Sequence, residues 1–365
     1  MVILLLSAAN SIHTVRWANS LSLKGNEVHV VSCKNQVEGV NKFLESVKVH
    51  YLRYNAGIGY YLNYRDLKKK IAAIKPEIIN VHYASGYGTL ARIAKIKKYL
   101  LNVWGSDVYD FPNESKFKEK IIKKNLKSAT YIASTSNCMA KVTNKYTDKK
   151  VYITPFGVDV DVFSEKNDKN NKDKFVLCTI KTLTPKYNIV GIIKAVDLSL
   201  KKLEASGNDI YKKIEYHIYG SGYQQEEIEK LITELGLQDK VFLKGYINNN
   251  IVPTILNDCD IFLLNSSLDS ESFGVSAVEA MACKKPVIAS DVDGFKEVIV
   301  DGESGIIVNR TDIATYSDKI VELVLNKELR DKLGINARKR VEELYNWDRN
   351  VDEMINIYKM MLNNS

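Results

Sequence analysis

The 365-residue chain has few cysteines, few prolines and no long apolar run. Its five cysteines are scattered and odd in number, which is typical of reduced, packed thiols and not of disulfides or a zinc site. No segment approaches the roughly 20 apolar residues that are needed to span a bilayer. The amino terminus lacks a basic region, so its short apolar run predicts a first buried strand and not a signal peptide. These features predict a cytoplasmic protein.

The charge is uneven along the chain. The formal net charge is +8, and the first 165 residues carry 25 Lys and Arg against 13 Asp and Glu. A basic half can indicate nucleic acid, an anionic membrane surface or an anionic substrate, and a solvated lysine-rich surface without a partner is the alternative. No DNA- or RNA-binding motif accompanies the charge, so we expect no nucleic-acid partner.

Strand and helix patterns alternate in both halves, which predicts two α/β domains with parallel, doubly wound sheets. The charged, Asn-rich stretch at 164–174 is typical of a connector. We therefore predict domains at 1–165 and 166–347, followed by a helix at about 348–365. The predicted strands are 2–7, 27–32, 47–52, 78–82, 99–103, 131–133, 151–153, 175–180, 215–219, 241–243, 261–264, 286–289 and 305–308.

The most informative stretch is 261–290. A buried strand pattern leads into a Ser/Asp-rich loop, then into Phe273-Gly274 and a helix pattern at 275–282. A helix N-terminus presents free N–H groups and the positive end of a dipole, which suit an anion such as a diphosphate. Glu271 and Glu279 lie eight residues apart, about two helical turns, and could project toward one side. Because carboxylates repel phosphate, we expect them to accept hydrogen bonds from hydroxyls; solvated acids on a capped surface helix are the alternative.

Glu271, then Phe273-Gly274, then Glu279-Ala-Met-Ala-Cys resemble the donor-site signature of family 4 glycosyltransferases. The resemblance implies the GT-B fold, two Rossmann-like domains whose parallel sheets face each other across a cleft, with the last helix crossing back near Asn346-Trp347. It implies a retaining glycosyltransferase whose nucleotide diphosphate sugar, uridine- rather than guanosine-linked, donates to a glycan or lipid-linked acceptor in cell-surface polysaccharide synthesis. The donor-binding residues that it implies are Ser272, Phe273, Gly274, Val275 and Glu279, with Gly220, Ser221 and Gly222.

Two lysines, Lys181 and Lys186, follow the first strand of the second half. Two cations just beyond a parallel strand could neutralise a leaving diphosphate, and a surface lysine pair is the alternative. The family usually has Arg and Lys at this spacing, so Lys181 is a departure that loses the bidentate fork of Arg. The turn at 220–222 is similar to the family's Gly-x-Gly beside the nucleotide, although a plain strand-to-helix turn fits equally well.

The strand ends of the first half carry the remaining candidates, since ligands of doubly wound sheets bind there. His82 could contact acceptor or sugar, or be structural. Trp104 replaces a His that contacts the donor sugar in relatives, while Asp107 keeps its place and could bind acceptor or brace the loop. Ala8-Ala9 replaces the Gly-Gly of many relatives, which makes backbone approach to diphosphate less assured. The acceptor-side candidates are Ala9, Asn10, His13, Arg16, Trp104 and Asp107.

We expect Lys181, Lys186, Glu271 and His82 to form the catalytic set, with Glu279 on the ribose and Glu271 on the sugar. The resemblance implies front-face attack, in which the leaving phosphate helps take the acceptor proton. Asp-x-Asp sequences at 159–161, 258–260 and 291–293 could be mistaken for metal-binding motifs. Because the cations and the helix N-terminus fill that role, we expect no metal and no cofactor, the nucleotide-sugar being a substrate.

A lysine-rich helix pattern at 116–127 raises the question of a membrane contact. Its apolar residues could lie on an anionic leaflet or pack inward, and a tyrosine cluster at 60–64 could help a peripheral contact with the inner face of the plasma membrane. Three other protein classes remain open: a GT-B sugar-nucleotide epimerase, a non-catalytic GT-B partner subunit and a nucleic-acid-binding protein.

Overall fold

The computed structural model describes residues 1–166 and 173–363. The chain divides into two compact units, Met1–Pro155 with Asp348–Ser365, and Phe156–Trp347. The sequence-based boundary is residue 165, but Val158 already pairs with Asn346 inside the second unit. Most of the predicted connector at 164–174 lies outside the described residues.

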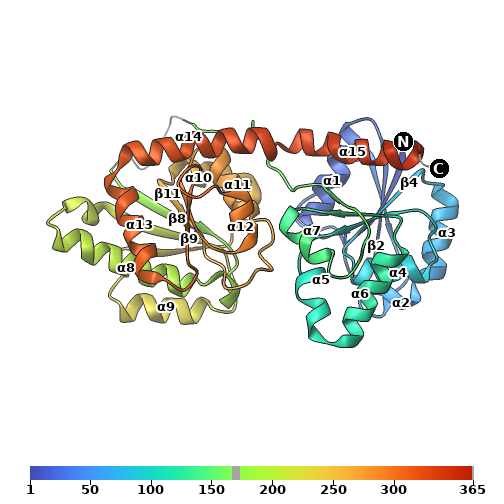
Figure 1. Ribbon diagram of the computed structural model, residues 1–365, viewed down its shortest axis with the longest axis horizontal. Helices are drawn as coiled ribbons and strands as arrows, with labels where there is room; N and C mark the ends of the chain where they lie inside the picture. The colour runs from blue at the N-terminus through green and yellow to red at the C-terminus, as the bar shows by residue number, and fades with distance from the viewer. Residues whose placement is uncertain (167–172, 364–365) are drawn as a thin grey trace. The chain divides into compact units, whose positions relative to one another are not determined.

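The first unit is built on a seven-stranded parallel sheet in the order β3-β2-β1-β4-β5-β6-β7 (Figure 1). Its strands are β1 (Val2–Leu6), β2 (Glu27–Ser32), β3 (Val47–Tyr51), β4 (Ile78–His82), β5 (Leu100–Val103), β6 (Tyr131–Ser134) and β7 (Val151–Ile153). Its helices are α1 (Ile12–Leu23), α2 (Gly59–Leu62), α3 (Tyr64–Ile74), α4 (Gly86–Ile93), α5 (Ser106–Tyr109), α6 (Lys116–Ser128) and α7 (Asn137–Thr143).

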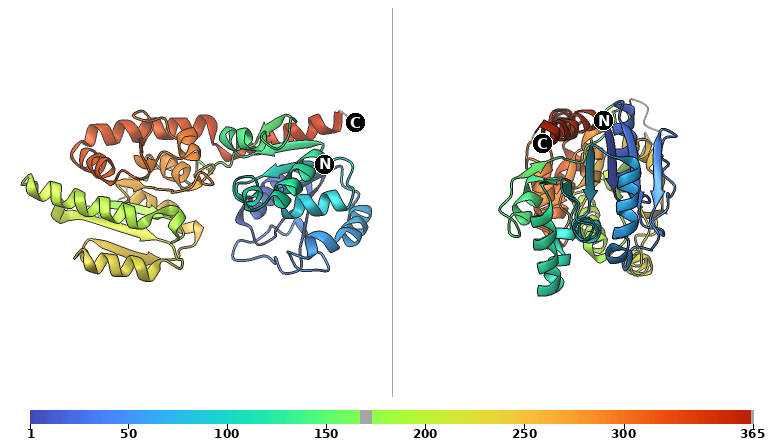
Figure 2. Two further views of the ribbon diagram at one scale, coloured as in Figure 1. Left: turned by 60° about the horizontal axis from the view of Figure 1, so that its bottom comes forward. Right: turned by 90° about the vertical axis from the view of Figure 1, so that its right-hand side faces the viewer.

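The last helix, α15 (Trp347–Asn363), packs on the first unit, where it appears in red (Figure 2). Tyr358 is fully buried, and the Asn80 amide donates to its hydroxyl at 2.6 Å. Lys24 forms ion pairs of 2.8 Å with both Asp348 and Asp352 at the start of the helix. A buried aromatic and a pair of acids therefore fix the helix to this sheet.

The second unit contains a six-stranded parallel sheet in the order β10-β9-β8-β11-β12-β13. Its strands are β8 (Phe175–Ile180), β9 (Ile214–Tyr219), β10 (Val241–Gly245), β11 (Ile261–Leu263), β12 (Val287–Ser290) and β13 (Ile306–Val308). Its helices are α8 (Ile189–Ala205), α9 (Gln225–Glu234), α10 (Val252–Asp258), α11 (Val275–Ala282), α12 (Asp293–Val298), α13 (Ile313–Leu325) and α14 (Lys327–Leu344).

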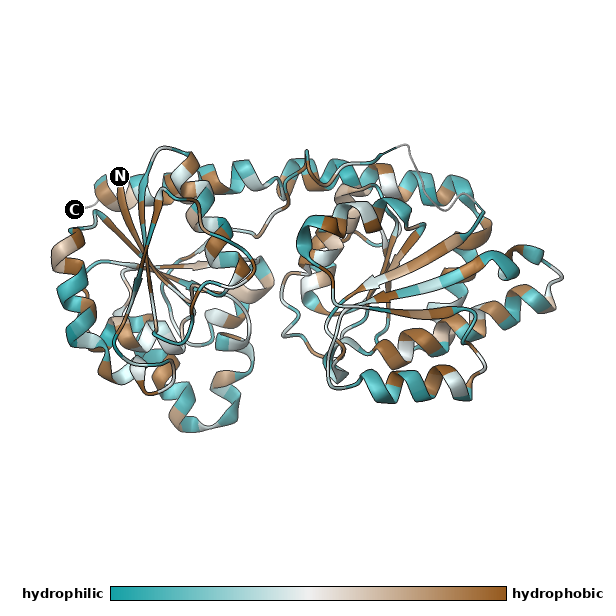
Figure 3. Cartoon of the chain, turned by 180° about the vertical axis from the view of Figure 1, so that it is seen from behind, coloured by the Kyte–Doolittle hydropathy of each residue, from teal (hydrophilic) through white to brown (hydrophobic). Residues whose placement is uncertain are grey.

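The central strands, such as β1, β8 and β11, are mostly apolar because helices cover both faces of each parallel sheet. In β1, the side chains of Ile3 to Leu6 are all fully buried, and Figure 3 shows brown stretches along the strands inside each unit. All thirteen predicted strands are present, so the prediction of two parallel α/β sheets is confirmed.

Helix α6 packs its apolar stripe inward. Ile121, Ile122 and Leu126 are buried in the core of the first unit, whereas Phe117 is 71% exposed. This arrangement follows the inward-packing alternative and leaves only Phe117 of the stripe for a membrane contact. Among the described residues, no helix combines the length and the apolar character needed to cross a bilayer.

Candidate functional site

Each sheet reverses its strand order beside its first strand, between β1 and β4 in one unit and between β8 and β11 in the other. At such a point the flanking helices diverge to opposite faces, and the carboxyl ends of the strands border a ligand crevice. Each reversal carries a polar contact between segments distant in sequence: His82 with Ser7, and Lys181 with Glu271. Both pairs include a residue that the sequence predicts to be catalytic.

In the second unit, Lys181 follows β8 directly, and its Nζ lies 3.1 Å from Glu271 Oε2. The two side chains are only 12% and 10% exposed. Burial alone would lower the pKa of Lys181, but the charge and hydrogen bond of Glu271, together with Tyr187 and Glu279, outweigh burial and raise this pKa above its ordinary value. Lys181 is therefore a charged ammonium group held close to two carboxylates.

Tyr187 joins the two predicted lysines. Its ring centroid lies 4.6 Å from Lys181 Nζ and 5.5 Å from Lys186 Nζ. The Lys186 carbonyl accepts the Ser267 N–H at 2.8 Å, which ties the loop after β8 to the loop after β11. We call Lys181, Lys186, Tyr187, Glu271 and Glu279 the lysine–glutamate cluster.

The Gly220-Ser221-Gly222 turn packs against the backbone that carries Lys181. A Cβ on Gly220, whose φ is +142°, would lie 1.9 Å from the Lys181 carbonyl oxygen, and one on Gly222 would lie 2.1 Å from that of Leu183. The Leu183 N–H donates to the Ser221 carbonyl at 3.0 Å. The chain therefore needs both glycines to place Lys181, whether or not a ligand also approaches them.

Helix α11 begins at Val275, after Gly274 in a left-handed conformation with φ +82°. A Cβ on Gly274 would lie 2.7 Å from the Phe295 ring, so both its conformation and its packing require glycine. The Phe273 ring packs edge-on against Phe156 and Tyr345, and Ser272 is buried. Phe273 therefore anchors the helix start within the unit.

Two buried hydroxyls beside this helix start, those of Ser270 and Ser276, have no hydrogen-bond partner among the described residues. Buried polar atoms without partners are uncommon and costly. The Glu279 side chain, farther along α11, is partly exposed, so its carboxylate can accept hydrogen bonds from a polyhydroxyl ligand.

Arg310, which follows β13, braces the loop that leads to Glu271. Its Nε donates to Asp291 Oδ1 at 3.0 Å, and its Nη2 donates to Asp269 Oδ1 at 3.1 Å. One guanidinium thus connects the ends of β11, β12 and β13.

In the first unit, His82 closes β4 and is buried. Its Nδ1 lies 3.0 Å from Ser7 Oγ, and its ring centroid lies 4.4 Å from that of Trp104. His13 approaches Trp104 edge-on at 5.8 Å. Burial, followed by the charge of His13, lowers the pKa of His82 to about 3, while burial, followed by the charge of Arg16, lowers that of His13 to about 4. Both imidazoles are neutral at physiological pH.

Asp107 is fully buried and braces the neighbouring loops. Its carboxylate accepts the backbone N–H groups of Ala84 at 2.7 Å, Gly105 at 2.9 Å and Trp104 at 3.1 Å. Burial raises the pKa of this carboxyl, and the N–H donors oppose that rise. Of the two roles left open by the sequence, the geometry matches bracing.

The loop after β1 has few groups left to bind a ligand. Ala9 is buried and its N–H donates to Ser32 Oγ at 3.0 Å, while Asn10 is exposed. The structure therefore brings His13, His82 and Trp104 together, whereas the Ala9 N–H is already used within the fold.

Two family models match the chain: "Glycosyl transferases group 1" over residues 159–340 and "Glycosyl transferase 4-like" over residues 2–136. The chain belongs to the group 1 glycosyltransferases. An uncharacterized glycosyltransferase of Methanocaldococcus jannaschii is 26% identical over 92% of this chain and 91% of its own length. A poly(ribitol-phosphate) α-N-acetylglucosaminyltransferase of Staphylococcus aureus is 31% identical over 49% of this chain and 34% of its own length.

The crystal structure of Anabaena HepE in complex with UDP superposes with a TM-score of 0.81 at 15% identity, covering 98% of this chain and 99% of that one. The glycosyltransferase therefore has the GT-B fold, as the sequence resemblance implied.

The Asp-x-Asp sequences of this glycosyltransferase have structural roles. Asp159 accepts the N–H groups of Asp161 and Val162, Asp260 accepts that of Val176, and Asp291 binds Arg310. Within residues 1–166 and 173–363, no group of three His, Cys, Asp or Glu side chains is arranged to hold a metal ion.

Sequence reasoning missed two members of the site, Tyr187 and Arg310. Tyr187 directly follows Lys186, so an aromatic residue beside a lysine pair is the signal that could have revealed it. Arg310 forms a hydrogen bond with Asp269, which lies 41 positions earlier in the chain, so no local pattern in the sequence indicates this contact.

Proposed function

We propose that this glycosyltransferase transfers a sugar, with retention and without a metal ion, from a uridine diphosphate sugar to a glycan or lipid-linked acceptor in cell-surface polysaccharide synthesis. The observation that carries the proposal is the lysine–glutamate cluster beside the start of α11, at the strand reversal of the second unit. The UDP complex of the Anabaena relative and the cell-wall polymer in the name of the Staphylococcus relative support the substrate classes.

The cluster combines two kinds of group that a nucleotide-sugar requires. Lys181, Lys186 and the free N–H groups of α11 supply positive potential for a departing diphosphate. Glu271 and Glu279 supply acceptors for sugar and ribose hydroxyls, respectively. The 3.1 Å contact of Lys181 with Glu271 means that a bound diphosphate shares the ammonium group with this carboxylate.

His82 fits hydrogen bonding better than general-base catalysis. With its pKa near 3, it holds a proton too weakly to act as a base near neutral pH. The leaving phosphate then takes the acceptor proton during front-face attack, and no protein nucleophile is required.

The first test is an incubation of the purified chain with a panel of nucleotide-sugars in EDTA, without acceptor. We expect slow hydrolysis of one UDP-sugar, and NMR of the first-released sugar should show the anomeric configuration of the donor. A requirement for divalent metal overturns metal independence, and release of the opposite anomer overturns retention. Conversion of the nucleotide-sugar to its epimer identifies an epimerase, whereas absence of any turnover indicates a binding subunit.

The second test compares Glu279→Ala with Glu226→Ala, since Glu226 is an exposed acid on α9 of the same unit. We expect Glu279→Ala to lower kcat/KM for donor hydrolysis about tenfold or more, as a hydrogen bond to a charged group contributes about 1.5–3 kcal/mol. Glu226→Ala should leave it unchanged. Equal rates in the two variants would remove Glu279 from the site.

The proposal also places the protein in the cytoplasm, with its basic first unit in peripheral contact with the inner face of the membrane. The excess of lysine and arginine over residues 1–165 supports that contact.

A further inference from the structure

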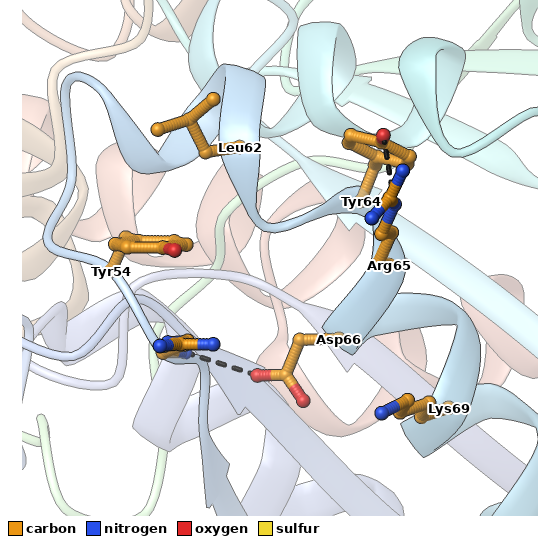
Figure 4. Close-up of a pocket in the computed structure, with 7 residues that line it drawn as sticks. Tyr54, Leu62, Tyr64, Arg65, Asp66 and Lys69 are labelled. Carbon is orange, nitrogen blue, oxygen red and sulfur yellow. Dashed lines mark hydrogen bonds between the residues drawn. The ribbon is translucent and has the colours of Figure 1, made fainter.

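A cavity of about 580 Å³ lies in the first unit, between the segment after β3 and the start of α3 (Figure 4). None of the residues that line it belongs to the predicted donor or acceptor sets. Three of them are cations, Arg53, Arg65 and Lys69, and one is an acid, Asp66. The cavity is therefore electropositive.

Its cations are unpaired among the described residues. Arg53, Arg65 and Lys69 form no ion pair with any carboxylate there, whereas Lys24 and Lys48 of the same unit each have an acidic partner. The Asp66 carboxylate instead accepts the Arg53 backbone N–H at 3.0 Å, which fixes the loop at the cavity wall. Clustered like charges repel one another, so an anion in the cavity would relieve this repulsion.

Both guanidinium groups are pre-oriented by neighbouring tyrosines. Arg53 Cζ lies 5.4 Å from the ring centroid of Tyr54, and Arg65 Cζ lies 5.7 Å from that of Tyr64. Arg65 Nε also donates to the Tyr64 hydroxyl at 3.0 Å. These contacts restrain each guanidinium group beside its tyrosine while terminal nitrogens stay available, which suits bidentate binding of a phosphate.

Large apolar side chains are exposed in the same segment. Ile58, Tyr61 and Leu62 are 63%, 48% and 44% exposed, and Leu62 also lines the cavity. Positions 58–62 of the chain thus carry three exposed large side chains, close in sequence to the lysines at 68–70. A ligand that carries an anionic head and an apolar chain would satisfy both features at once.

We propose that this cavity binds a phosphate group attached to a hydrophobic chain, the head group of a phospholipid or of a lipid-phosphate-linked acceptor. Arg53 and Arg65 hold the phosphate, Lys69 adds charge, and the chain lies over Ile58, Tyr61 and Leu62. The proposal deepens the proposed function and rests on it for the identity of the acceptor. The shared chemistry is the phosphate, which could also come from a water-soluble phosphoglycan.

The test is co-sedimentation of the full chain with vesicles of phosphatidylcholine alone or with 20% phosphatidylglycerol, beside a titration with soluble glycerol 3-phosphate. The variant is Arg53→Gln/Arg65→Gln. Its matched control is Lys120→Gln/Lys124→Gln, which removes two exposed charges from α6 of the same unit. At about 1 kcal/mol per cation near an anionic surface, the arginine variant should bind anionic vesicles about thirtyfold more weakly, and the control variant less than threefold.

Loss confined to the arginine variant supports the site, and the probe that shows the loss identifies the phosphate source. Equal loss in both double variants, or no binding of either probe, overturns it. Arg65→Lys retains the charge but loses the fork of the guanidinium. It should bind anionic vesicles more tightly than Arg53→Gln/Arg65→Gln if charge dominates, and as weakly as that variant if the fork is required. Donor hydrolysis should be unchanged in all variants, so failure here is distinguishable from failure of the donor-site assignment.

Discussion

The contact between Lys181 and Glu271 gives the sharpest energetic prediction. Lys181 Nζ lies 3.1 Å from Glu271 Oε2, and both side chains are largely buried. Glu271→Gln therefore leaves a buried ammonium group without its main partner. Removing one member of a buried pair costs about 3–5 kcal/mol. Because Glu279 and the Tyr187 ring remain beside Lys181, we expect the lower end, about 3 kcal/mol.

Lys181→Met fills similar space without charge, so Lys181→Met/Glu271→Gln should be more stable than Glu271→Gln alone. Two-state unfolding of a chain with two units is not assured, so the readout should be local. Hydrogen exchange of β8 amides, followed by mass spectrometry, reports on the second unit alone. In Glu271→Gln they should exchange about a hundredfold faster than in the wild type, corresponding to about 3 kcal/mol.

A double-mutant cycle separates the pair from its surroundings. We expect a coupling energy of about 2 kcal/mol or more between the two positions. Additive effects, or a double variant less stable than both singles, would refute the ion pair as an organising contact of this site.

Three further predictions follow from other contacts. Between pH 7 and 5 the free energy of unfolding of the first unit should fall by about 2 kcal/mol through His82. The pKa of His82 is about 3 when folded and about 6.5 when unfolded, and each pH unit contributes about 1.4 kcal/mol. The same pH dependence of β4 amide exchange, corrected for its intrinsic rate, in wild type and His82→Asn would contradict this. Gly220→Ala should destabilise the second unit and weaken UDP binding. The control is Gly207→Ala, because Gly207 has a positive φ but open space around it, and this change should cost only about 1 kcal/mol. Gly220→Ala should cost more than that. Arg310→Ala should raise the donor KM several-fold but lower the free energy of unfolding by only about 1 kcal/mol, because the ion pairs with Asp269 and Asp291 are partly exposed. Arg310→Lys should restore KM in part. An unchanged KM in both variants would show that donor binding does not need these ion pairs.

The strands could be predicted because buried parallel strands appear as continuous apolar runs bounded by turn residues. Helix α5, by contrast, has only four residues, Ser106–Tyr109, too few to show a period, and the sequence did not predict it. The residues at the strand ends were found for a general reason, since the topology of a doubly wound sheet places ligands there.

Electrostatic states and packing roles could not be predicted. The pKa of His82 depends on burial against Trp104 and on His13, which come from other strands and helices. From the sequence, the Gly-x-Gly turn could serve either close approach of a ligand or a plain turn. The fold reveals that the Lys181 and Leu183 carbonyls occupy the space that a Cβ would need at these glycines. Such contacts link residues far apart in sequence and leave no local periodicity.

The most direct test of the central claim, donor binding by the lysine–glutamate cluster, is calorimetric titration of the full chain with UDP. Lys186→Ala is compared with Lys194→Ala, which removes an exposed lysine from α8 of the same unit. We predict that UDP binds the wild type and the control equally and binds Lys186→Ala about tenfold or more weakly, because a charge-assisted contact to phosphate is lost. Equal affinity in all three proteins would contradict the account.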